Sequence, residues 1–134
     1  FSDLRKLFPD SFIHFAATHR GATLYIDRAQ IEQVLINLIK NAKESCGQNT
    51  APQIEVELEQ VPGKVCSLTV RDNGEGILPE VIDKVFVPFF TTKPSGSGIG
   101  LSLCKQIMNL HGGTITVSSE IGKGSCFTLM FPGR

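Results

Sequence analysis

A stretch of about twenty residues, from Asp27 to about Cys46, carries apolar side chains at the spacing of one helix face. The apolar positions are Ile31, Val34, Leu35, Leu38, Ile39 and Ala42. Asp27 followed by Gln30 is typical of a capping box at a helix start, and Gly47 with the polar run to Pro52 ends the pattern. We therefore expect one long helix whose apolar stripe is buried against a second layer of structure.

The rest of the chain alternates between strand patterns and turn residues. In residues 54–59 three apolar residues alternate with three glutamates, which predicts a strand with one wet face. Other strands are predicted at 11–16, 22–26, 65–72, 115–119 and 125–131, with Pro62-Gly63 as a tight turn. A short helix is predicted near 79–85 and a longer one at 101–110, which Gly112-Gly113 would end.

Length and composition narrow the class of protein. The 134 residues suit one domain, and 41% hydrophobic residues predict a globular fold. Thirteen Lys and Arg balance thirteen Asp and Glu, so the basic excess of a nucleic-acid-binding protein is missing. The four cysteines have no close-paired zinc spacing and are expected to be reduced, in a cytoplasmic setting. No apolar run approaches the roughly 20 residues of a membrane span, so we expect no direct membrane contact by this domain.

Two asparagines interrupt the long helix. Asn37 and Asn41 lie four residues apart and so on one side of it, with Asn41 at the border of the apolar stripe. Asparagine is a poor residue for a helix interior, so two of them on one line indicate a ligand. The alternative is a solvated polar edge.

The segment Asp72-Asn73-Gly74-Glu75-Gly76 ends a predicted strand. Counting by twos, Asp72 shares a strand face with three apolar residues, so burial of that face would bury a carboxylate in need of a donor. The glycines allow a sharp turn and a close approach to a ligand. The alternative is an ordinary Asn-Gly turn beside an acidic residue.

Glycines at alternate positions precede the third helix, in Gly96-Ser97-Gly98-Ile99-Gly100-Leu101. Free N–H groups at a helix start favour phosphate. The segment lacks the Gly-Lys-Ser/Thr of a Walker loop and does not follow a strand as a Rossmann turn does. Before it, residues 85–93 hold three phenylalanines, which either anchor a mobile lid at about 91–99 or form ordinary core beneath a long loop.

In their order and spacing, these segments resemble the ATP-binding domain shared by histidine kinases, gyrase, the Hsp90 chaperones and MutL. The asparagine box is Asn37-Leu38-Ile39-Lys40-Asn41-Ala42, and the first glycine box is residues 72–76. The phenylalanine box, the second glycine box and a tail from His111-Gly112-Gly113 through Gly122-Lys123-Gly124-Ser125 to Pro132 follow in order. The resemblance covers about residues 22–132. It implies an α/β (α+β) two-layer sandwich, in which a mixed, mostly antiparallel sheet of about five strands packs on three helices under an ATP lid.

The resemblance also implies the cofactors, ATP and Mg²⁺, and a role for each site residue. Asp72 would accept the adenine amino group, Gly76 would let the purine lie close, and Thr128 would reach adenine through a water. Asn41 would bind Mg²⁺, with Asn37 beside the phosphates, and both are the candidate catalytic residues. The remaining candidate nucleotide contacts are Gly74, Ile77, Phe90, Thr92, Lys93, Gly96, Ser97, Gly98, Ile99, Gly100 and Leu101.

Asn37 separates the branches of this family. The hydrolases and related serine kinases carry there a glutamate that acts as general base, and an asparagine cannot take up a proton. Neutral imidazole is already a nucleophile at pH 7, so the asparagine favours a histidine kinase. The alternatives are a hydrolase or serine kinase of the same fold, or a nucleotide-binding module without catalysis.

The acceptor histidine is not expected within this chain. His14, His19 and His111 lie outside the context of the family's phosphoacceptor, which sits on a separate dimerisation domain earlier in the protein. We therefore expect residues 1–10 to be a linker from such a domain, residues 11–134 to be the catalytic domain, and a response regulator to act downstream. The full protein could carry a membrane anchor elsewhere. Many histidine kinases have a basic residue after the asparagine box; here Lys40 or Lys43 is the candidate for that charge.

Overall fold

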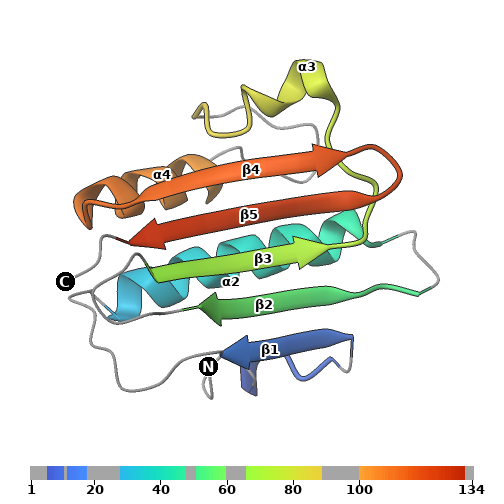
Figure 1. Ribbon diagram of the computed structural model, residues 1–134, viewed down its shortest axis with the longest axis horizontal. Helices are drawn as coiled ribbons and strands as arrows, with labels where there is room; N and C mark the ends of the chain where they lie inside the picture. Colours follow the sequence, from blue (N-terminus) through green and yellow to red (C-terminus); the bar gives the residue numbers. More distant parts are fainter. Residues whose placement is uncertain are drawn as a thin grey trace.

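The computed structural model describes residues 6–10, 12–17, 28–47, 51–59, 66–88 and 100–131. The strands are β1 (Ile13–Ala17), β2 (Ile54–Glu59), β3 (Cys66–Asp72), β4 (Thr114–Glu120) and β5 (Gly124–Phe131), and the helices are α2 (Arg28–Ser45), α3 (Pro79–Ile82) and α4 (Gly100–Leu110). The strands form one sheet in the order β1-β2-β3-β5-β4 (Figure 1). β1 pairs with β2 in parallel, and the other neighbours are antiparallel.

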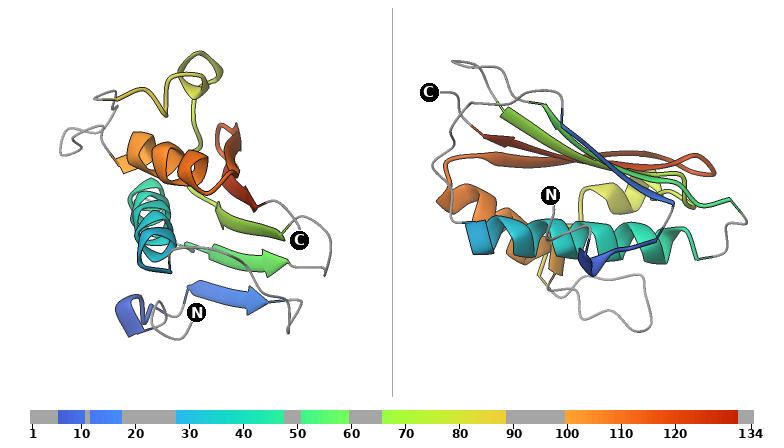
Figure 2. Two further views of the ribbon diagram at one scale, coloured as in Figure 1. Left: turned by 90° about the vertical axis from the view of Figure 1, so that its left-hand side faces the viewer. Right: turned by 90° about the horizontal axis from the view of Figure 1, so that it is seen from below.

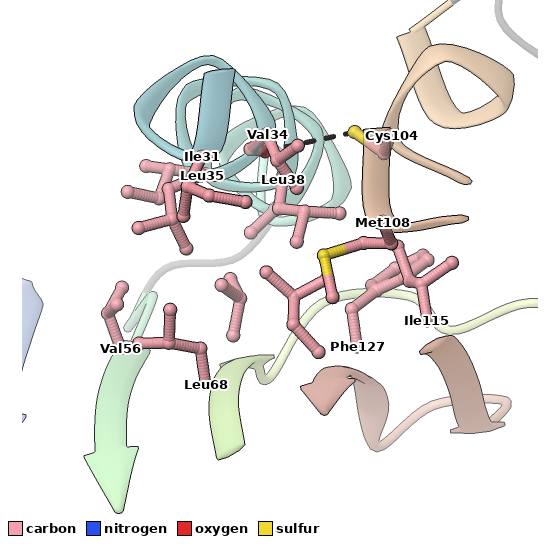
Figure 3. Close-up of a cluster of buried hydrophobic side chains, with 14 of the residues drawn as sticks. Ile31, Val34, Leu35, Leu38, Val56, Leu68, Cys104, Met108, Ile115 and Phe127 are labelled. Atoms are coloured by element: carbon pink, nitrogen blue, oxygen red, sulfur yellow. Dashed lines mark hydrogen bonds between the residues drawn. The ribbon is translucent and has the colours of Figure 1, made fainter. Parts of the chain in front are cut away.

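The two long helices lie side by side on one face of the sheet, as Figure 2 shows. The apolar stripe of α2 faces alternate residues of β2, β3 and β5, while α4 covers the part of the sheet that includes Ile115 and Phe127 (Figure 3). Strand residues on the other face, such as Glu55 and Arg71, are exposed. The predicted two-layer fold with a mixed, mostly antiparallel sheet is confirmed.

All six residues of the predicted apolar stripe are buried in the core, with Val34 and Ile39 fully so. Three of the four cysteines also lie there; burial raises the pKa of the Cys66 thiol and raises that of Cys104 to about 11. The four cysteines are free thiols. The three buried cysteines act as small apolar residues within the core, as their surroundings in the sequence indicate.

Element boundaries differ from those predicted by at most three residues, and the strand at 54–59 has the predicted bounds. The short helix ends at Ile82, and residues 83–86 continue as turns. It has no buried residue, so packing does not extend it. The predicted strand at 22–26, the helix cap at Asp27 and the Pro62-Gly63 turn lie outside the described residues. No helix in the described parts of the chain is long and apolar enough to cross a membrane.

Candidate functional site

Asn37 of α2 faces the amino end of α4. Its Nδ2 lies 3.8 Å from Cys104 Sγ, and a Cβ placed on Gly100 would be 4.0 Å from its Cγ. The Cys104 thiol donates its own proton to the Val34 carbonyl, so the sulfur accepts and the Asn37 amide turns its NH₂ toward it. The Asn37 oxygen accepts from Gln33 Nε2 at 3.2 Å. The helix start predicted to favour phosphate therefore lies beside the asparagine box, with Asn41 half-buried one turn further along α2.

Asp72 ends β3 on the face turned toward the helices. It is 5% exposed and alternates with buried Cys66, Leu68 and Val70, so the predicted buried carboxylate is confirmed. The backbone N–H of Gly74 donates to its Oδ1 at 2.9 Å. A carboxylate accepts several hydrogen bonds, so Asp72 can also take a donor from a ligand.

The loop after Asp72 is tied to its neighbours by hydrogen bonds. Asn73 accepts from the Gln53 N–H at 2.8 Å through Oδ1 and donates to the Ala51 carbonyl at 2.9 Å through Nδ2. The N–H of Glu75 donates to the carbonyl of Ser45 at the end of α2. A fixed loop holds Asp72 in place between β2 and the helix that carries both asparagines.

The glycines of this loop meet backbone rather than open space. A Cβ on Gly74 would overlap Ser45, and one on Gly76, at φ +81°, would meet the Glu120 carbonyl. The N–H of Gly122 donates to the Glu75 carbonyl at 3.0 Å, which joins the β4–β5 turn to the loop. Close backbone packing thus requires these glycines, while the predicted approach of a purine to Gly76 stays a prediction.

A row of polar side chains crosses three strands beside Asp72. Asp72 pairs with Ser125 of β5, and Ser125 pairs with Ser119 of β4. The two serine hydroxyls are 2.9 Å apart, and Ser119 Oγ also accepts the Ile77 N–H at 2.7 Å. The sequence assigns no role to either serine, although Ser125 belongs to the matching tail, because only the pairing of β3 with β5 places them next to the carboxylate.

Thr128 lies on the opposite face of the sheet from Asp72. Its hydroxyl is 3.9 Å from Cys126 Sγ, its neighbour on the same face, and it pairs with Thr69 and Thr116. Thr128 is three residues from Ser125, and an odd separation along a strand reverses the side chain's direction. The structure therefore does not bring Thr128 to Asp72; the hydroxyl group found there belongs to Ser125.

The aromatic segment is described as far as Pro88. Phe86 packs edge to face on Phe127, with ring centroids 6.2 Å apart, and Lys105 Nζ lies 5.8 Å from the Phe86 ring. Leu101, in the first turn of α4, is half-buried. The other predicted contacts of the lid lie outside the described residues, namely Phe90, Thr92, Lys93, Gly96, Ser97, Gly98 and Ile99.

Lys43, which we considered as a phosphate contact, is engaged elsewhere. Its Nζ is 3.0 Å from Asp10 Oδ2 and 5.7 Å from the centre of the Phe8 ring. Phe8 is itself buried in the core. The segment predicted to be a linker therefore packs on the domain through Phe8 and Asp10, and Lys40, exposed on α2, remains the other candidate for the positive charge.

Comparison with known proteins places this geometry in a family. Residues 26–134 match the model described as histidine kinase-, DNA gyrase B- and HSP90-like ATPase, and the chain belongs to that family. Its curated relatives include the sensor histidine kinase ZraS of Escherichia coli, 38% identical over 90% of this chain and 25% of ZraS. The C4-dicarboxylate transport sensor protein DctB of Rhizobium meliloti is 45% identical over 69% of this chain and 15% of DctB. The chain thus spans about a quarter or less of the length of these relatives.

Solved structures agree with the family. The catalytic domain of histidine kinase ThkA has a TM-score of 0.84 and 32% identity, covering 98% of this chain and 90% of the ThkA chain. Full-length ShkA, in complex with AMPPNP, has a TM-score of 0.78 and 26% identity over 90% of this chain and 25% of ShkA. The likeness to isolated ThkA covers nearly the whole of both chains, so the five-stranded sheet and its helices form a catalytic-domain fold of the histidine kinase type.

Proposed function

We propose that this chain binds Mg·ATP and transfers the γ-phosphate to a histidine on a separate dimerisation domain, as the catalytic domain of a two-component sensor histidine kinase. The observation that carries the proposal is the position of two features along α2, one near its end and one nearer its start. Buried Asp72 lies near the end of α2 at Ser45, and the Asn37 amide lies nearer its start, beside the amino end of α4. A nucleotide lying along α2 would have its base near Asp72 and its phosphates near Asn37.

The residues present suit ATP. A buried carboxylate beside a fixed glycine loop provides an acceptor for the adenine amino group, with Gly74, Gly76 and Ile77 around it. Ser125, opposite Asp72, supplies in place of Thr128 the strand hydroxyl beside the base. Asn41 provides an amide oxygen, a ligand type that Mg²⁺ accepts. When bound, Mg²⁺ neutralises charge on the phosphates, and the start of α4 favours the same anionic groups.

Asn37 supports transfer to a partner rather than hydrolysis. In the hydrolases of the family this position holds the base that activates water, whereas an amide takes up no proton at neutral pH. The Asn37 oxygen accepts from Gln33 and its NH₂ faces Cys104, so its side chain is held rather than free to turn. A histidine nucleophile needs no such base, because neutral imidazole attacks directly.

The relatives suggest the partners. One structure similar to this chain holds histidine kinase ThkA in complex with response regulator protein TrrA. By analogy, we propose that this chain works in the cytoplasm with the phosphoacceptor domain of its own protein, and that a response regulator receives the phosphoryl group. Segment 6–10, packed on α2 through Phe8 and Asp10, is the natural route of connection to that domain.

Labelled γ-phosphate tests the proposal. The chain alone should bind ATP and release little phosphate, and addition of a dimerisation domain of its own protein should produce a labelled product. Transfer should be slow because the tether's high effective concentration is absent. The product should be labile in acid and stable in alkali, as expected of phosphohistidine. Brisk hydrolysis by the chain alone, or stable label on its own serine or threonine, would instead indicate the hydrolase or serine-kinase branch.

A further inference from the structure

Ser119 sits at the end of the polar row, away from Asp72, and three parts of the chain meet at its hydroxyl. We infer that Ser119 is a specificity-determining positioning residue, which holds the Ser125 hydroxyl as a hydrogen-bond acceptor beside Asp72 and so selects 6-aminopurine over 6-oxopurine nucleotides. The inference rests on the proposed nucleotide site. It adds a residue that would not itself touch the base.

The direction of the hydrogen bonds follows from counting protons. Ser119 Oγ lies 2.9 Å from the Gly124 carbonyl, which can only accept, so the Ser119 proton goes there. Ser119 Oγ accepts the Ile77 N–H at 2.7 Å. The remaining contact, 2.9 Å to Ser125 Oγ, must then use the proton of Ser125. Because Ser125 donates its proton to Ser119, the lone pairs of its hydroxyl face the opposite direction along the row.

The other side of Ser125 in the row is Asp72. The two residues are directly opposite each other on adjacent antiparallel strands, and both are buried on the face toward the helices, at 6% and 5% exposure. Side chains so placed have Cβ atoms about 4.5–5.5 Å apart. The row thus offers two adjacent acceptors, a carboxylate oxygen and a hydroxyl lone pair.

Two adjacent acceptors match one chemical group on a purine. An exocyclic amine carries two N–H donors on one nitrogen, whereas a 6-oxopurine has an acceptor oxygen at that position. The oxygen would face the lone pairs of Ser125, and a buried acceptor opposed by another acceptor is costly. If Ser119 loses its hydroxyl, the Ser125 hydroxyl no longer donates to Ser119 and can turn its proton toward a 6-oxo group.

A purely structural role for Ser119 predicts a different result. Its hydroxyl satisfies the Ile77 N–H and the Gly124 carbonyl, so its loss also loosens the β4–β5 turn and the loop. That loosening would weaken ATP and inosine triphosphate alike. The positioning role changes their ratio, because it acts on the atom that differs between the two bases.

The experiment is calorimetric titration of the 134-residue chain with ATP and with inosine triphosphate, both with Mg²⁺. We expect the unsubstituted chain to prefer ATP by at least about tenfold. Ser119→Ala should lower that preference by about five- to tenfold, mainly by tightening inosine triphosphate. Ser119→Thr keeps the hydroxyl and should restore the preference. Ser118→Ala is the matched control, because Ser118 is the exposed neighbour on the same strand and points to the other face.

The outcomes separate the two proposals. Failure of the unsubstituted chain to bind ATP would overturn the proposed function and this inference with it. ATP binding with a preference unchanged in folded Ser119→Ala would overturn the inference alone. If Ser119→Ala does not fold, Ser125→Ala replaces it: removal of the hydroxyl should lower the same preference, and an unchanged ratio there also overturns the inference.

Discussion

Replacing Asp72 by asparagine exchanges one oxygen of a buried side chain for an NH₂ group at nearly constant shape. The Gly74 N–H, 2.9 Å from Oδ1, still needs an acceptor, so the amide oxygen of the variant should stay there. In the proposed site, the NH₂ group then takes the place of the other carboxylate oxygen and faces the adenine amine, donor against donor. A hydrogen bond to a charged group is lost, which is worth about 2–3 kcal/mol, or roughly 30- to 150-fold in Kd.

Calorimetric titration with Mg·ATP measures this loss of affinity. A control variant and a second measurement on Asp72→Asn show whether the loss comes from the adenine contact. Glu75→Gln is the matched control, since it removes a charge from an exposed position of the same loop. Burial raises the pKa of the Cys46 thiol and the charge of Asp72 raises it further, so Asp72→Asn should also lower that pKa in an alkylation-rate titration. A folded variant with the lowered Cys46 pKa and an unchanged Kd for ATP would refute Asp72 as the adenine anchor.

Three further predictions concern the metal, the turn and the core. Asn41→Ala should reduce phosphoryl transfer far more than adenosine binding, because it removes the proposed Mg²⁺ ligand while alanine suits a helix; equal losses in the two assays would contradict the assignment. Gly124→Ala should lower the free energy of unfolding in urea by at least about 2 kcal/mol, because a Cβ at φ +129° would overlap the Asp72 carbonyl. Gly122→Ala, with φ +81° and open space around the Cβ, should lower it by only about 1 kcal/mol. Similar losses in the two variants would argue against the overlap. Burial raises the pKa of the Cys104 thiol from 9.0 to about 11, so the thiol keeps its proton to a higher pH in the folded state than in the unfolded state. Its contribution to the free energy of unfolding is therefore intact below pH 9 and falls by up to about 3 kcal/mol as the pH rises from 9 toward 11. Cys104→Ala should flatten this part of a urea-unfolding pH series under reducing conditions.

The interaction between Asn37 and Cys104 shows what a sequence can indicate only in part. The sequence indicates Asn37 by its spacing from Asn41 on a helix, and it indicates the glycine-rich helix start by the free N–H groups that such a start offers to phosphate. Asn37 and Cys104, which lie 67 residues apart in the chain, come into contact only because α2 and α4 pack side by side. The same holds for Lys43, whose partner Asp10 is 33 residues earlier and replaces the phosphate that we considered for it.

Local periodicity was enough to place Asp72 on the buried face, because successive side chains of a strand alternate and three apolar residues shared its side. It was also enough for the buried stripe of α2, since residues three and four apart lie on one helix face. Thr128 is predicted from family likeness alone, and the same alternation along β5 argues against it. Ser125, an odd number of residues away, is on the face of Asp72, and Thr128 is on the other.

The sequence by itself determined whether each long element is a helix or a strand, which of its faces is buried, and the order of the motifs along the chain. Each of these can be read from the spacing of residues within a single segment. Only the tertiary structure decided that β5 lies between β3 and β4, and hence that Ser125 and Ser119 extend the row that begins at Asp72. Strand order and register depend on how distant segments bury their apolar faces together. Any of several pairings would satisfy the alternation of one strand, and the packing of the whole sheet on α2 and α4 selects among them.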